Sequence, residues 1–248
     1  MILEALNYAA SWPVTSAAHR PFIRSSVNLW ARANRCRADW ADHERRTMAT
    51  ILSAAEACRQ RRTVVVLGSG LLRDVPVAEL SRLFDTVVLV DLVHLASVRS
   101  WLTVKRFKNI RLIERDLSGL DALLAGEAVE PLSFLRQVPY LDFVVSANLL
   151  SQIGVGAARK LEGHVDAEVL VPQVIAAHLE GLAQVPAATC LVTDVGYTVI
   201  DRNNQTHETV DLMHGVDPGP VRDSWDWPVI PFGEESRDYK IVHRVIVR

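Results

Sequence analysis

Short apolar runs alternate with stretches of helical spacing through the middle of the chain. The runs cover residues 63–67, 86–90, 110–113, 141–145 and 189–193, and most of them end at Gly, Asp or another turn residue. A run of four or five mainly β-branched residues that meets a turn is typical of a strand buried on both faces. Helical spacing follows in 75–84, 92–105, 149–162 and 169–184, and 117–138 holds a helix and a loop. This alternation predicts an α/β fold with a doubly wound, mainly parallel sheet.

The two ends of the chain follow other patterns. Residues 1–26 predict a short helix and an irregular arm, and residues 26–59 lack Pro and Gly and predict one long helix or two short ones. After residue 195 the alternation stops, and a hairpin, a loop rich in Pro, Gly and Trp, and a last strand at 241–247 are expected. We therefore predict an N-terminal helical cap (1–62), a Rossmann-like cofactor-binding core (63–195) and a C-terminal β-rich tail (196–248).

Composition narrows the class of protein. With 248 residues, 49% of them apolar, the chain is long enough to bury a continuous core. Its three cysteines are far apart and form no C-x-x-C pair, which argues against a disulfide framework or a cysteine zinc site. No signal peptide or membrane-length apolar run is present, so a cytoplasmic location without membrane contact is expected. The net charge of −2 gives no overall attraction to nucleic acid, although residues 1–62 carry ten Arg and no Lys.

The turn Gly68-Ser69-Gly70 follows the first predicted strand. In doubly wound sheets ligands bind at the carboxyl ends of the strands, where a glycine turn lets the backbone approach the ligand closely. The chain has neither a full G-x-G-x-x-G pattern, because Arg73 stands where the third glycine would be, nor a phosphate-binding G-K-[ST] sequence. The alternative interpretation is a tight turn without a ligand.

Two aspartates follow the next two predicted strands. Asp91 comes 21 residues after Gly70, where an acidic side chain can accept hydrogen bonds from the two hydroxyls of a ribose. Asp116, after the third strand, could accept a hydrogen bond from an adenine amine. For both, a helix-capping role is the competing interpretation.

Four segments in this order resemble the core motifs of class I S-adenosylmethionine-dependent methyltransferases. They are Val64-Val-Val-Leu-Gly-Ser-Gly70, Val87-Val-Leu-Val-Asp91, Ile113-Glu-Arg-Asp116 and Asp142-Phe-Val-Val-Ser-Ala-Asn148-Leu-Leu-Ser-Gln-Ile153. The resemblance covers about residues 63–195 and implies S-adenosylmethionine as cofactor. It implies that Gly68, Ser69 and Gly70 lie under the methionine part, that Asp91 holds the ribose and Asp116 the adenine, and that Ser146 to Asn148 line the transfer site. It also implies a seven-stranded sheet ending in an antiparallel strand.

The chain departs from that family in ways that bear on the site. No acidic residue precedes the glycines, and Arg73 and Asp74 stand at the expected start of the next helix. Asn148 is a candidate for positioning a substrate, and Asp194, which ends the fifth strand, for binding it or acting as a base. His178 lies alone in a predicted helix and is more typical of a packed residue. No metal site is expected, because His207, Asp211 and His214 lie in a segment that reads as strand.

The leading hypothesis is a methyltransferase that acts on a small molecule, with nucleic acid a less favoured acceptor. One alternative is an NAD(P)-dependent oxidoreductase, which the absence of a Tyr-x-x-x-Lys relay disfavours. Another is a non-catalytic interaction module that acts through its Arg-rich helix. That helix, with Trp30 and Trp40, could form a substrate lid, a homodimer contact or an RNA contact. The loop with Trp225 and Trp227 could close over the site or plug the sheet edge.

Overall fold

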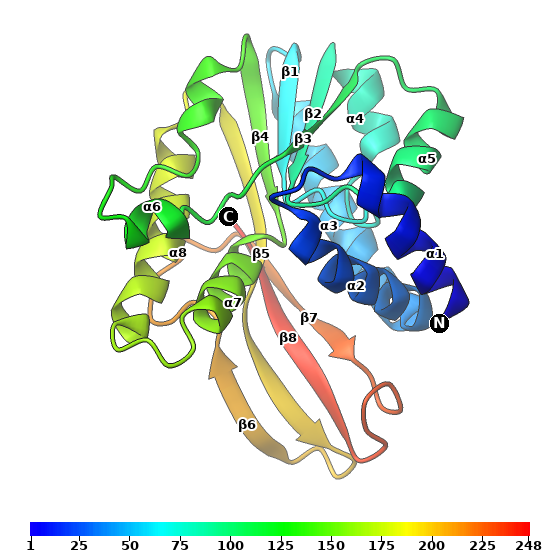
Figure 1. The fold of residues 1–248 in the computed structure, drawn as a ribbon, viewed down its shortest axis with the longest axis vertical. Coiled ribbons are helices and arrows are strands. Elements are labelled where there is room, and N and C mark those ends of the chain that lie inside the picture. Colours follow the sequence, from blue (N-terminus) through cyan, green and yellow to red (C-terminus); the bar gives the residue numbers. More distant parts are fainter.

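A twisted central sheet with helices on both faces forms the molecule in the computed structural model, which describes residues 1–248 (Figure 1). The α-helices are α1 (Ile2–Ser11), α2 (Ile23–Arg35), α3 (Arg37–Ala57), α4 (Val77–Leu83), α5 (Ala96–Lys105), α6 (Leu120–Leu124), α7 (Leu150–Lys160) and α8 (Ala167–Gln184). The strands are β1 (Thr63–Leu67), β2 (Thr86–Asp91), β3 (Ile110–Glu114), β4 (Leu141–Ala147), β5 (Ala188–Asp201), β6 (Thr206–Asp211), β7 (Asp223–Ile230) and β8 (Tyr239–Val247).

The sheet order is β3-β2-β1-β4-β5-β8-β7, with β6 paired to β5 outside this path. Strands β1 to β5 are parallel in their shared part, and β8 is antiparallel to β5 and to β7. The prediction of a doubly wound, mainly parallel sheet is confirmed. The antiparallel strand that the resemblance implies is β8, although it lies inside an eight-stranded sheet and β7 forms the edge.

Two apolar layers hold the helices to the sheet. Alternate residues of β1 point to opposite faces, so Val64 and Val66 join the cluster with helices α2 to α5, while Val65 and Leu67 join the cluster with α6 to α8. All five β1 residues are buried, which explains why this strand is a continuous apolar run rather than an alternating one.

The C-terminal strands extend the same sheet and do not form a separate tail. Strand β5 runs without interruption through the boundary expected at residue 195, and beyond the end of β4 its outer half pairs with β6 and β8. The Trp-rich segment expected to be a loop contains the edge strand β7. Pro228 is accommodated there because it lies at a register shift between Trp227 and Ile230 on an edge strand.

Two further expectations concern where the helices begin and end. The segment 26–59 forms two helices, α2 and α3, that meet at Cys36. Helix α4 begins only at Val77, so Arg73 and Asp74 lie in an irregular loop and not at a helix start, contrary to the expectation. None of the helices is both long and apolar enough to cross a bilayer.

Candidate functional site

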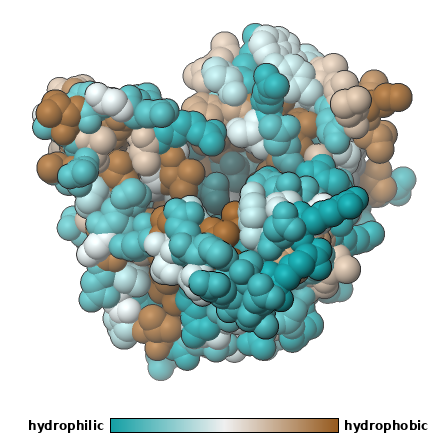
Figure 2. Space-filling model, turned by 90° about the horizontal axis from the view of Figure 1, so that it is seen from below, coloured by the Kyte–Doolittle hydropathy of each residue, from teal (hydrophilic) through white to brown (hydrophobic).

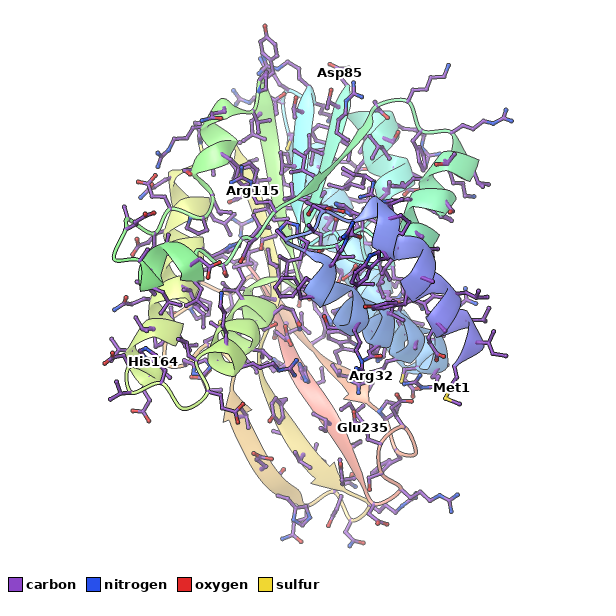
Figure 3. All side chains as sticks on the ribbon, in the orientation of Figure 1. Met1, Arg32, Asp85, Arg115, His164 and Glu235 are labelled. Carbon is purple, nitrogen blue, oxygen red and sulfur yellow. The ribbon has the colours of Figure 1, made fainter.

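The carboxyl ends of β1, β2 and β4 meet at one edge of the sheet. Asp85 directly precedes β2 and lies at the top of Figure 3. Because β1, β2 and β4 are parallel, all three begin near the top and end toward the middle of the molecule. Figure 2 looks at the molecule from the lower end of Figure 1 and shows a hollow at the centre of this face, with polar and apolar side chains on its walls. The edge formed by the carboxyl ends of the strands is where ligands bind in open parallel sheets.

The glycine turn is joined directly to the end of the neighbouring strand. Gly68 N–H donates to the Val90 carbonyl (3.0 Å), and Gly70 N–H donates to Asp91 Oδ2 (2.6 Å). Both glycines have a positive φ, of 73° and 48°, which side chains disfavour. A Cβ at Gly68 would lie 2.6 Å from the Leu149 Cβ, whereas a Cβ at Gly70 would meet no atom closer than 3.8 Å. Gly68 is therefore required by packing against the segment after β4, and the space beside Gly70 is open to a ligand.

The turn and Asp91 fit the ribose and amino-acid parts of S-adenosylmethionine. The Leu92 N–H donates to Asp91 Oδ1 (2.7 Å), so each carboxylate oxygen accepts one backbone hydrogen bond and keeps a second lone pair. Burial raises the pKa of this carboxyl above its ordinary value. The Ser69 hydroxyl is fully buried and has no hydrogen-bond partner within the protein. A buried hydroxyl without a partner at this edge is a polar group that a ligand can satisfy.

The other two predicted cofactor residues have different surroundings. Asp116 is exposed, and its Oδ1 accepts the Ser118 N–H (2.8 Å), as in the capping interpretation. The side chain of Ser146 is fully buried in the layer under α8, where its hydroxyl lies 3.0 Å from His178 Nε2. Because it faces the core instead of the ligand edge, we leave the Ser146 side chain out of the site proposed below.

Asn148 links three segments at the end of β4. Its φ of +47° places it in the left-handed region, which Asn tolerates better than most residues. Its Nδ2 donates to Asp74 Oδ2 in the loop after the glycine turn (2.5 Å) and lies 3.2 Å from His43 Nε2 on α3. Its Oδ1 is buried and has no partner. Burial raises the pKa of Asp74, and a separate ion pair between Arg73 and Glu44 (2.5 Å) joins this loop to α3.

His43 is a buried, neutral member of this group of residues. The Trp225 indole N–H donates to His43 Nδ1 (3.1 Å), and the Trp227 ring stacks on the imidazole with 3.8 Å between ring centroids. Burial lowers the pKa of His43 to about 4. Its Nδ1 accepts from Trp225 and its ring stacks on Trp227, so His43, with a side chain shut off from solvent, is suited to hold these two tryptophans in place.

Asp194 lies just beyond the point where β4 ends, and it is only 2% exposed. Its Oδ1 accepts a hydrogen bond from the Ser151 hydroxyl, and its Oδ2 lies 2.5 Å from Nδ1 of His243 on β8. Burial acts to raise its pKa, but the hydrogen bonds with His243 and Ser151 outweigh burial and lower it. The residue predicted as catalytic is therefore a buried carboxylate behind a histidine.

The N-terminal segment is held to the rest of the molecule by charged groups at two places. The Ser16 N–H donates to Glu114 Oε2 at the end of β3 (2.9 Å), and Arg99 binds the other oxygen of this carboxylate (2.8 Å). In Figure 3, Arg32 on α2 and Glu235 in the loop between β7 and β8 lie next to each other, and they form an ion pair. The cap thus contacts both the cofactor edge and the outer strands.

A separate cavity of about 270 Å³ lies between α8 and the segment before β4. Glu130, Arg136 and Glu180 are among its lining residues, and none of the predicted site residues is. It therefore has no part in the site at the strand ends.

Sequence reasoning missed His43 and His243 as members of this site, although it named Trp227 in a segment that could close over the site. His43 and His243 come from α3 and β8, and about 200 residues separate them. Each is a single residue in an ordinary helix or strand pattern, and no local motif marks it. The only indication in the sequence was that aromatic residues and histidines occur in the two segments on either side of the core, 1–62 and 196–248.

No protein-family model matches the chain, and no curated protein matches it either. Among solved structures, it is similar to a SAM-dependent methyltransferase from Aquifex aeolicus (11% identity, TM-score 0.36, covering 79% of this chain and 87% of that one). It is also similar to the 23S rRNA methyltransferase ErmE (15% identity, TM-score 0.32, 81% and 68%) and to the YcgJ protein from Bacillus subtilis (13% identity, TM-score 0.36, 60% and 51%). The chain spans about half the length of YcgJ.

The sheet topology itself defines the fold. The doubly wound, mainly parallel strand order and the antiparallel β8 agree with the sheet that the resemblance of the four sequence segments to class I S-adenosylmethionine-dependent methyltransferases implies.

Proposed function

We propose that the chain transfers the methyl group of S-adenosylmethionine to a small-molecule acceptor bound beside Asn148. The observation that carries this proposal is the hydrogen bond between Gly70 N–H and Asp91 Oδ2. It joins the turn after β1 to the acidic end of β2, the two adjacent strand ends at which a doubly wound sheet holds a nucleoside. When bound, S-adenosylmethionine supplies a methyl group on a positively charged sulfur.

The residues of this chain divide the binding of the cofactor between them. The free lone pairs of the Asp91 carboxylate accept hydrogen bonds from the ribose hydroxyls, and the open side of Gly70 and the Ser69 hydroxyl contact the amino-acid part. Asp116 is exposed next to this edge, where it can accept a hydrogen bond from the adenine amine. The N-terminal arm is held at Glu114, at the end of β3.

The acceptor is held on the other side of Asn148. Asn148 is fixed by its hydrogen bond to Asp74, and its buried Oδ1, which has no partner within the protein, is the acceptor that a substrate donor would satisfy. Methyl transfer requires in-line alignment of the nucleophile, the methyl carbon and the sulfur, so a rigid Asn148 contributes by positioning. Tyr197 on β5 and Trp227 on β7 both pack against the ring of His243 on β8 and form an aromatic wall next to this position.

Calorimetric titration with S-adenosylhomocysteine, the product of the cofactor, tests the proposal. We expect micromolar binding to the wild type and at least a 30-fold weaker Kd for Asp91→Ala, because two charge-assisted hydrogen bonds to ribose are lost. Asp85→Ala is the matched control, because this exposed aspartate lies at the opposite end of β2 and should leave the Kd unchanged. Binding of NADH in place of S-adenosylhomocysteine would favour the oxidoreductase, and binding of neither by folded protein would refute the proposal.

A further inference from the structure

Asp194 and His243 form a buried carboxylate–imidazole pair with a defined tautomer. His243 Nδ1 lies 2.5 Å from Asp194 Oδ2, and a carboxylate oxygen can only accept. The proton of a neutral His243 is therefore on Nδ1, and Nε2 carries a lone pair. The Ser151 hydroxyl donates to the other oxygen of Asp194, which fixes the carboxylate from the side of α7.

The lone pair on His243 Nε2 is free and accessible. This atom makes no hydrogen bond within the protein and is not among the fully buried polar atoms, and the side chain is 15% exposed. The buried histidines differ from it: His178 lies in the core beside Ser146, and His94 Nε2 contacts the Ile113 carbonyl. His243 therefore combines an oriented imidazole with a nitrogen that a bound molecule can reach.

The pair is connected to the transfer site from two directions. Trp227 packs edge-on against His243 (6.0 Å between ring centroids) and stacks on His43, which in turn contacts Asn148. On the other side, Ser151 lies in the first turn of α7, three residues after Asn148. Tyr197 covers a face of the His243 ring with 5.4 Å between centroids, which limits its rotation.

We infer that His243 is the general base of the reaction and that the methyl acceptor is a hydroxyl group, either phenolic or alcoholic. This inference rests on the proposed function. The acceptor oxygen forms a bond to the methyl carbon as the bond from that carbon to sulfur breaks, and the hydroxyl proton moves to His243 Nε2. The products are a methyl ether, a neutral thioether and an imidazolium. Asp194 is a positioning residue, because its negative charge stabilises the imidazolium and its Oδ2 keeps the proton on Nδ1.

The need for a base selects the class of acceptor. A hydroxyl oxygen is a weak nucleophile until its proton is removed, and a positioned base contributes about 100- to 10,000-fold to such a step. A pyridine nitrogen or a thioether sulfur has no proton to lose and gains nothing from a base. An oriented histidine that is linked to Asn148 through Trp227 and His43 is therefore the feature expected of an enzyme that methylates oxygen.

The test compares two kinds of acceptor in protein supplied with methyl-labelled S-adenosylmethionine. One set contains phenol, catechol and small alcohols, and the other contains pyridine and a dialkyl thioether. We expect His243→Gln to lower transfer to hydroxyls at least 100-fold while leaving the Kd for S-adenosylhomocysteine within threefold of the wild type. His207→Gln is the matched control, because His207 forms a similar pair with Asp201 (2.9 Å) at the exposed tip of the β5–β6 hairpin.

Each outcome is decisive for the inference. Transfer only to the proton-free acceptors, or equal hydroxyl transfer by wild type and His243→Gln, would overturn it. If the wild type binds S-adenosylhomocysteine but transfers no methyl group to hydroxyls, the inference is overturned as well. The proposed function would then remain intact. Failure to bind S-adenosylhomocysteine would instead remove the proposed function, and the inference with it.

A spectroscopic measurement tests the positioning role of Asp194 without turnover. Long-range ¹H–¹⁵N correlation of histidine-labelled protein distinguishes the two neutral tautomers. We expect the neutral form of His243 to carry its proton on Nδ1 in the wild type and to lose this preference in Asp194→Asn. A proton on Nε2 in the wild type would exclude this nitrogen as the base.

Discussion

Gly68 shows how a single residue shapes the sheet edge at the ends of β1 and β4. Its positive φ allows the chain to turn directly after β1, and its missing side chain allows the segment after β4 to approach within contact distance. The sequence indicated a ligand-binding turn, but the structure shows that Gly68 and Gly70 have different roles. Gly68 is needed for packing, and Gly70 borders the open space beside Asp91.

Gly68→Ala should destabilise the protein by about 3 kcal/mol, since it adds a left-handed strain of about 1 kcal/mol to the cost of overpacking against Leu149 and Ala147. Gly126→Ala is the matched control, because Gly126 also has a positive φ but no atom within 4 Å of the added Cβ. It should cost only about 1 kcal/mol. Urea unfolding measures both values. Equal losses for the two variants would show that Gly68 is not held by this contact.

The residues of the site differ in how far the sequence could predict them. Gly70 and Asp91 are predictable because the ends of two adjacent parallel strands must lie together, and the sequence marks both ends. The direction of the Ser146 side chain could not be predicted, since it depends on which face of β4 meets α8. His243 was not predictable either, because its importance arises from a contact with Asp194, 49 residues away on another strand.

At the scale of elements, α8 is joined to the sheet by a buried polar contact within an apolar layer. His178 on α8 and Ser146 on β4 are both fully buried, with 3.0 Å between Nε2 and the hydroxyl oxygen. Burial lowers the pKa of His178 to about 4, from a usual value of 6.5. The packing of this helix on the sheet therefore depends on a histidine that stays neutral.

This histidine should make the free energy of unfolding depend on pH. The unfolded chain binds a proton at His178 below pH 6.5, whereas the folded chain does so only near pH 4. The stabilising effect is complete above pH 6.5 and falls by about 3 kcal/mol as the pH drops toward 4. In urea unfolding at several pH values, His178→Gln should show a correspondingly weaker dependence than the wild type. His164→Gln, at an exposed position before α8, should match the wild type, and an unchanged slope in His178→Gln would contradict the account.

Most of the elements could be predicted from their patterns, and the exceptions have physical causes. Strands β1 to β5 are short apolar runs, so their position and parallel pairing follow from the alternation with helices. Strand β7 was expected to be a loop because Pro228 disfavours a strand, and only its edge position and register shift accommodate that residue. The outer half of β5 was expected as the first strand of a separate hairpin, because it is only partly buried and does not continue the apolar run of the inner half.

At the scale of the whole molecule, residues from both ends of the chain complete the site around the central sheet. The α2 residue Arg35 binds Glu234 in the loop between β7 and β8 (2.6 Å), and Trp40 on α3 donates to the Val229 carbonyl (3.1 Å). These contacts place His43 beside Trp225 and Trp227. The predicted helical cap therefore packs against β7 and the loop after it, and it carries His43 of the proposed site.

The most direct test of the central claim is to map where S-adenosylhomocysteine binds, by amide chemical shifts of the labelled wild-type protein. The account predicts saturable shifts of the amides at residues 69–72, 91–93 and 148–149, which surround the ends of β1, β2 and β4. Residues 128–136, at the separate cavity, should not shift. Shifts confined to that cavity, or no saturable shifts at all, would contradict the claim that this sheet edge is a methyl-donor site.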